Sequence, residues 1–284
     1  MVSKTARGLS RWTLRCGSMR RVLASLPSSL FGSLFASLLA GGLATPVVAD
    51  PIAELDDAQA RAQYAFYTAD ARALEDVAAV TERLEVPDSL APLKAYNAAY
   101  ARWKLAELYD EAADRSNTRA ARALATKAAQ ACLSHTKNTL LTDAKMVEIY
   151  VVDAACSTLA RTSRAAEVRA LVPPCARSRS FRTALEIAPD NPRVMLMADL
   201  CPLSAAPTSV DRLRATLAAF DAAPPSRPGY PDWGQAEALL VLGQYYLQQG
   251  DARAARDVIE KALVIAPDYR KARELLDTVA VRPR

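Results

Sequence analysis

The sequence has one histidine, His135, and none of the motifs that usually mark an enzyme active site. Most zinc hydrolases need two or three histidine ligands, and no second Cys-His cluster completes the pair that His135 could form with Cys132 on one helix face. A Gly-rich phosphate loop, a G-x-S-x-G elbow and a C-x-x-C pair are all absent from the sequence. We therefore expect no metal, no cofactor and no enzymatic activity, with His135 at the surface or packed.

Carboxylates do occur in groups, but the groups lie on predicted amphipathic helices. Asp56 and Asp57 form one such group, and Glu107, Asp110 and Glu111 form another. Acidic and basic residues alternate along these helices, which is typical of an ion-paired exterior. The pattern favours solvated helix faces over acid–base catalysis.

Glycine and aromatic residues are also scarce. The 284 residues include 9 glycines and 6% aromatic residues, and long runs rich in Val, Ile and Thr are absent. Alanine, leucine and arginine, which favour helices, are abundant. This composition predicts an all-α fold.

Acidic residues are missing from positions 1–49, which hold six basic ones. The formal net charge of the whole chain is +5, from 36 basic and 31 acidic side chains. Without residues 1–49 the chain keeps 30 basic side chains against the same 31 acidic ones, a net charge of −1. A nucleic-acid binder needs a basic face, so we expect no nucleic-acid partner.

Residues 1–49 have the layout of a secretory signal peptide. Arg20 and Arg21 precede an uncharged stretch of apolar and small residues at 22–43, and a Val-x-Ala sequence ends at Ala49. Cleavage after Ala49 would give a soluble periplasmic or secreted protein with no stable membrane anchor. Retention of the apolar run as an anchor is the alternative, and translation from Met19 would give a leader of ordinary length.

A repeat pattern occupies residues 236–269, AEALLVLGQYYLQQGDARAARDVIEKALVIAPDY. Apolar and small residues recur at fixed helical offsets, at Leu239, Leu242, Gly243, Tyr246, Ala255, Ile259, Ala262 and Pro267. Gly243 and Ala255 are small where two antiparallel helices must approach closely, and Gly250-Asp251 is a turn and cap signal. The set of positions resembles the tetratricopeptide repeat.

A second segment supports a repeat array. The segment at 181–193 has the sequence FRTALEIAPDNPR and contains Pro189. It resembles KALVIAPDYRK, the end of the repeat at 236–269. The resemblance implies a right-handed superhelical solenoid over residues 50–284, with about five helix pairs and a capping helix at 270–280. The last third of the chain also resembles secreted bacterial repeat proteins of unassigned function. The segments that carry this resemblance are APDNPR, the Pro202–Pro207 interruption and PDWG. That resemblance implies a fold and no reaction.

The exported part of the chain contains four cysteines, Cys132, Cys156, Cys175 and Cys201. Four thiols in an oxidising compartment suggest two disulfides. Antiparallel helices place residues opposite each other when they are equally far from the connecting turn. Cys132–Cys156 and Cys175–Cys201 each straddle a predicted inter-repeat turn in this way. Cys156–Cys175, which straddles a break near Ser163, and four free thiols are the alternatives.

Binding residues are expected from two sources. In the terminal repeat, the groove positions of the tetratricopeptide family fall on Glu237, Gln244 and Gln248. Separately, Tyr96, Tyr100 and Trp103 form an aromatic stripe at helical spacing, which predicts either core between helix pairs or the lining of a ligand groove.

The function expected from this combination is a non-enzymatic scaffold in the cell envelope that binds another protein or peptide. The alternative is an envelope protein that binds a small apolar or carboxylate ligand for a transporter. It would require a cavity lined by Tyr96, Tyr100 and Trp103.

Overall fold

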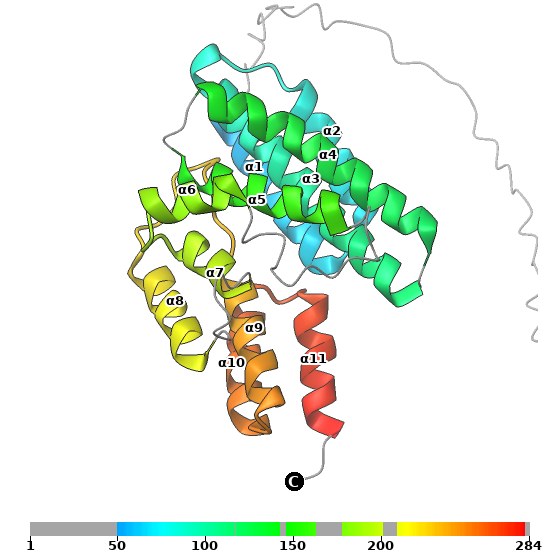
Figure 1. The fold of residues 1–284 in the computed structure, drawn as a ribbon, viewed down its shortest axis with the longest axis vertical. Coiled ribbons are helices and arrows are strands. Elements are labelled where there is room, and N and C mark those ends of the chain that lie inside the picture. The colour runs from blue at the N-terminus through cyan, green and yellow to red at the C-terminus, as the bar shows by residue number, and fades with distance from the viewer. Residues whose placement is uncertain (1–49, 117, 143–145, 163–177, 201–208, 282–284) are drawn as a thin grey trace, which may run out of the picture. The chain divides into compact units, whose positions relative to one another are not determined.

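The computed structural model describes residues 50–116, 118–142, 146–162, 178–200 and 209–281, and this part of the chain is all-helical with no β-strand (Figure 1). Besides the short 3-10 helix η1 (Asp88–Leu90), it has eleven α-helices: α1 (Pro51–Thr68), α2 (Ala71–Arg83), α3 (Ala91–Ser116), α4 (Arg119–Thr142), α5 (Val147–Thr162), α6 (Arg179–Ile187), α7 (Pro192–Leu200), α8 (Val210–Ala222), α9 (Gln235–Gln248), α10 (Ala252–Ile265) and α11 (Arg270–Val281). The expected all-α class is confirmed.

Residues 1–49 lie outside the described residues, so the signal peptide and its cleavage after Ala49 stay predictions. Within the described part, none of the helices is both long enough and apolar enough to cross a membrane.

Local capping residues set several helix boundaries. The side chain of Asp70 accepts a hydrogen bond of 2.9 Å from the backbone N–H of Ala73 at the start of α2, and Asp251 does the same for Ala254 at the start of α10. Gly250 has a φ of +82° between α9 and α10, a left-handed conformation that glycine adopts without steric cost. The cap at Asp251 and the turn at Gly250-Asp251 are as predicted from the sequence.

Small residues allow α9 and α10 to pack closely. A Cβ atom added to Gly243 would lie 2.6 Å from Cγ1 of Ile259, which is closer than non-bonded carbon atoms approach. Ala255, on the facing side of α10, is fully buried. The close approach that the sequence predicted for Gly243 and Ala255 is confirmed.

The helices pack in chain order. Each helix contacts the next one. First helices of successive pairs also contact each other in α1–α3, α3–α5 and α5–α7, and α9 contacts the last helix, α11. One further contact breaks the order, because α1 also touches α11. There the rings of Tyr67 and Tyr269 are 4.6 Å apart between centroids.

A disulfide joins α4 to α5. Cys132 and Cys156 are bonded, with their Cα atoms 6.2 Å apart, and both residues are fully buried. This is the pairing that the rule of equal distance from the turn favoured, and it excludes the Cys156–Cys175 alternative. Cys175 and Cys201 lie outside the described residues, so their pairing stays a prediction.

We expect replacement of both Cys132 and Cys156 by alanine to lower the free energy of unfolding by about 3 kcal/mol, because the bond closes a loop in the unfolded chain. Urea unfolding followed by circular dichroism measures this loss. Equal stability of the double variant and the parent protein would show that the bond does not constrain the unfolded chain.

Candidate functional site

A proline-rich connection between α8 and α9 runs across the first two helix pairs. We call residues 224–233 the strap. The backbone N–H of Gly229 donates to Asp56 of α1 at 2.7 Å, and its carbonyl accepts from Asn97 of α3 at 2.9 Å. The carbonyl of Tyr230 accepts from Gln59 of α1 at 2.7 Å. Side chains of α1 and α3 therefore satisfy backbone groups of a segment more than a hundred positions away in the chain.

Trp233 ends the strap inside an aromatic cluster. Its indole Nε1 donates to the hydroxyl of Tyr96 at 2.7 Å. Its ring lies 5.9 Å from that of Tyr100 in a stacked arrangement and 5.0 Å from that of Trp103 in an edge-to-face arrangement, measured between centroids. The exposed fractions of Trp233, Tyr96, Tyr100 and Trp103 are 4%, 0%, 0% and 3%. The cluster fixes the start of α9 against α3.

Beside this cluster lies a cavity of about 400 Å³, which we call the central groove. Side chains of α1, α3, α5, α7, α9 and α11, the first helix of each pair and the last helix, line it. Its apolar wall includes Phe66, Trp103, Leu196, Met197, Leu240 and Val241. Its charged residues are Lys104, Glu107, Asp110, Glu111, Arg193, Glu237 and Lys271.

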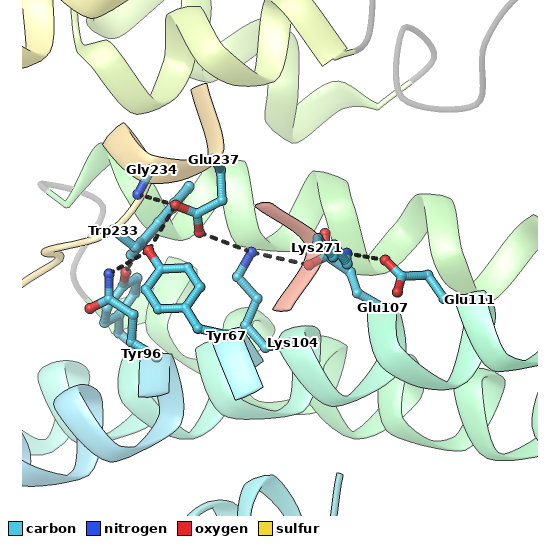
Figure 2. A network of polar contacts seen from close by, with 10 residues as sticks. Tyr67, Tyr96, Lys104, Glu107, Glu111, Trp233, Gly234, Glu237 and Lys271 are labelled. Atoms are coloured by element: carbon cyan, nitrogen blue, oxygen red, sulfur yellow. Dashed lines mark hydrogen bonds and ion pairs between the residues drawn. The ribbon is translucent and has the colours of Figure 1, made fainter. Parts of the chain in front are cut away.

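Glu237 and Lys104 form the polar centre of the groove (Figure 2). One carboxylate oxygen of Glu237 accepts from the hydroxyl of Tyr67 at 3.0 Å and from the backbone N–H of Gly234 at 3.1 Å. The other lies 3.7 Å from Nζ of Lys104, which is also 3.0 Å from Glu107. Burial, reinforced by the charge of Glu237, raises the pKa of Tyr67 far above its usual value. The tyrosine therefore stays protonated and donates to Glu237.

Lys104 is buried although it carries a charge, with only 3% of its side chain exposed. Its ammonium lies 3.9 Å from the ring centroid of Trp103 and 4.2 Å from that of Phe66. Aromatic faces attract cations, and two carboxylates supply the charge that burial requires. Lys104 thus holds Glu237 and Glu107 at the groove.

The acidic residues of α3 are more closely surrounded than the sequence indicated. Glu107, Asp110 and Glu111 were expected on a solvated face; all three are half-buried and line the central groove. Burial is the main cause that raises the pKa of Asp110 above its usual value, followed by the charge of Asp114, while Arg122 opposes the shift. Periodicity identified this face as polar but could not show that α7, α9 and α11 would cover it.

Some buried polar atoms of the groove make no hydrogen bond to the described residues. They are Nε1 of Trp103, Nε of Arg193 and Oε1 of Glu237. A buried polar group without a partner costs about 1–3 kcal/mol, so folded proteins rarely keep such groups without a reason.

The residues implied by the family resemblance have three different placements. Glu237 lines the central groove and is buried in the network of Figure 2. Gln244 lines the groove and is exposed, whereas Gln248 is exposed outside it. Sequence reasoning missed Lys104 and Lys271, since a lysine on an amphipathic helix is expected in water.

The three residues of the aromatic stripe also have different placements in the structure. Trp103 lines the central groove, but Tyr96 and Tyr100 line neither the groove nor the larger cavity beside it. Both tyrosines are packed in the Trp233 cluster, which is the core alternative that the sequence left open.

That larger cavity, of about 490 Å³, lies against the strap. Tyr64, Phe220, Pro224 and Ile265 contribute to its wall, and Arg193 lines both cavities. Much of its lining comes from this connecting segment, whereas the central groove is lined mainly by helices, together with Trp233 and Tyr269.

His135 lies at a separate cavity of about 410 Å³. Its Nε2 is 3.1 Å from Glu82, whose carboxylate also accepts two hydrogen bonds from Arg102 at 2.8 and 2.9 Å. Burial alone would raise the pKa of Glu82, but the hydrogen bonds and charges of Arg102 and His135 together lower it. In the described part of the chain, no group of three His, Cys, Asp or Glu residues is placed to hold a metal ion.

Comparison of the chain with models of protein families, with curated proteins and with solved structures finds no match.

We expect Lys104→Met to lower the free energy of unfolding by about 3 kcal/mol or more, because it leaves Glu237 buried without its cation. Adding Glu237→Gln should recover part of this loss, since the neutral amide oxygen still accepts from Tyr67 and Gly234. A double-mutant cycle by urea unfolding at pH 7 measures the coupling. Strictly additive losses would contradict the proposed pairing.

For Asp110→Asn we expect higher stability at pH 7. The pKa of Asp110 is raised in the folded protein, so the protonated carboxyl stabilises the native state, and this contribution is lost as pH rises through the folded pKa. Removing the charge should therefore help at pH 7 and give progressively less as pH falls toward the unfolded value, about 3.8.

Thermal unfolding between pH 3 and pH 7 tests this dependence. Glu260→Gln removes one negative charge at an exposed position of α10 and serves as the matched control. An Asp110→Asn protein that is less stable than the parent at pH 7 would contradict the expectation.

Proposed function

We propose that the protein is a non-enzymatic scaffold of the tetratricopeptide type, which binds an extended segment of another protein in its central groove. The observation that carries this proposal is the lining of the groove by the first helix of each pair and by α11. In stacked helix pairs, these helices form the concave surface on which repeat proteins bind partners.

The packing order supports the same architecture. Contacts between successive helices and between successive first helices are those expected of stacked helix pairs, and the eleven helices of the described residues fit five pairs and a cap. The right-handed superhelix implied by the resemblance is part of this proposal. So is export to the cell envelope, which rests on the leader.

The chemistry of the groove suits a peptide better than a small apolar ligand. The ligand-carrier alternative needed Tyr96 and Tyr100 on a cavity wall, and both are packed in the Trp233 cluster. A peptide supplies a carbonyl for Nε1 of Trp103 and an N–H for Oε1 of Glu237, two atoms that make no hydrogen bond to the described residues, and apolar side chains for Leu240 and Val241.

The test compares partners captured from the source cell's envelope extract by the parent protein, residues 50–284, and by Val241→Trp. Val241 is half-buried at the groove wall, so a tryptophan there fills the groove. Val264→Trp adds the same ring at a site that is 82% exposed and serves as the control. Circular dichroism verifies that both variants fold.

We expect mass spectrometry to find at least one protein that the parent and Val264→Trp retain and that Val241→Trp loses about tenfold or more. Capture that is identical for all three proteins would overturn the groove as the binding site.

A further inference from the structure

The central groove contains more carboxylates than the cations within it can balance. Lys104 is shared between Glu107, at 3.0 Å, and Glu237, at 3.7 Å. Lys271 forms an ion pair with Glu111. These two lysines therefore face three carboxylates.

Asp110 adds a fourth carboxylate to the same wall. It lies on α3 between Glu107 and Glu111, and neither groove lysine is paired with it. The remaining cation, Arg193, lies 4.0 Å from Glu148, a carboxylate outside the groove. With Arg193 counted against Glu148, two lysines in the groove face four carboxylates, three of which lie on α3. Arg122 of α4, outside the groove lining, is the cation whose charge acts on Asp110.

Two buried groups beside this acidic wall have an atom that makes no hydrogen bond to the described residues, and the two atoms have opposite hydrogen-bonding character. Trp103 is 3% exposed, and its Nε1 is a donor without an acceptor among the described residues. Glu237 is 9% exposed, and its Oε1 is an acceptor without a hydrogen-bond donor there. A peptide backbone offers a carbonyl to the first and an N–H to the second.

Apolar side chains of α7 and α9 also line the groove. Leu196 and Met197 of α7 and Leu240 of α9 are buried, while Leu200 of α7 is 51% exposed at the groove. A large apolar side chain that remains exposed beside a cavity is typical of a surface that a partner covers.

We infer that the central groove binds an extended apolar peptide that carries a lysine or arginine side chain, with the cation at Asp110 and the apolar side chains on Leu196 and Leu240. The inference rests on the proposed function and names the chemistry of its ligand. A backbone carbonyl of the peptide accepts from Trp103. The cation supplies the positive charge that the α3 wall lacks.

The experiment selects peptides from a displayed library of random octapeptides on the parent protein, Asp110→Asn, Asp110→Lys and Val241→Trp. Peptides that bind the parent but not Val241→Trp define the groove-dependent pool. Glu260→Lys, at an exposed position of α10, controls for net charge. Because Asp110→Asn removes the charge of a half-buried carboxylate, it keeps the test valid if Asp110→Lys does not fold.

We expect the groove-dependent pool of the parent to be enriched in one Lys or Arg flanked by apolar residues. Replacing that residue by norleucine should weaken binding about tenfold, the effect of one ion pair of moderate strength. The enrichment should fall for Asp110→Asn, reverse to Asp or Glu for Asp110→Lys, and persist for Glu260→Lys.

Three other outcomes would overturn the inference, and they show whether the proposed function is overturned with it. A groove-dependent pool without enrichment in basic residues would overturn the inference and leave peptide binding in place. The absence of any pool that depends on Val241 would overturn both. Competition by cadaverine, a free diamine, with full displacement of the selected peptide at equal concentration, would show that the site recognises the amine alone and would also overturn the inference.

Discussion

The central groove depends on the contact of Trp233 with Tyr96, Tyr100 and Trp103. The hydrogen bond between Trp233 and Tyr96 joins residues that lie 137 positions apart in the chain. In a simple array of stacked repeats, each unit contacts only its neighbours. Here the strap brings α9 against α1 and α3, and Tyr269 brings α11 against α1. The central groove is bordered by these distant helices together, so it exists only while the connection holds.

Burial of one cation follows from this closure. Lys104 would be an ordinary exposed lysine on an isolated α3, but α1, α9 and the strap enclose it with aromatic faces and with Glu237 (Figure 2). A buried ion pair contributes little net stability compared with apolar packing, but it leaves a charged and geometrically fixed surface at the groove. Trp103 and Glu237, each with a buried atom that makes no hydrogen bond to the described residues, line that groove.

Local features were predictable from the sequence, and distant pairings were not. The caps at Asp70 and Asp251 involve residues three positions apart, and the Cys132–Cys156 bond follows from two helices joined by one turn. Periodicity also identified the aromatic stripe of α3. It could not place Lys104 in the interior or the acidic face of α3 at a groove, because both depend on which later helices return to cover α3. That return is made by the strap, whose contacts with α1 and α3 join residues more than a hundred positions apart in the chain.

Native-state hydrogen exchange, measured by mass spectrometry with increasing urea, tests the closure most directly. If the strap ties the ends together, backbone amides of α1, α3 and α9 should open with the same free energy and merge into one unfolding unit. If α9, α10 and α11 instead open at a distinctly lower free energy while α1 and α3 stay protected, the first and last pairs are independent. In that case the central groove would not be a stable feature of the folded protein.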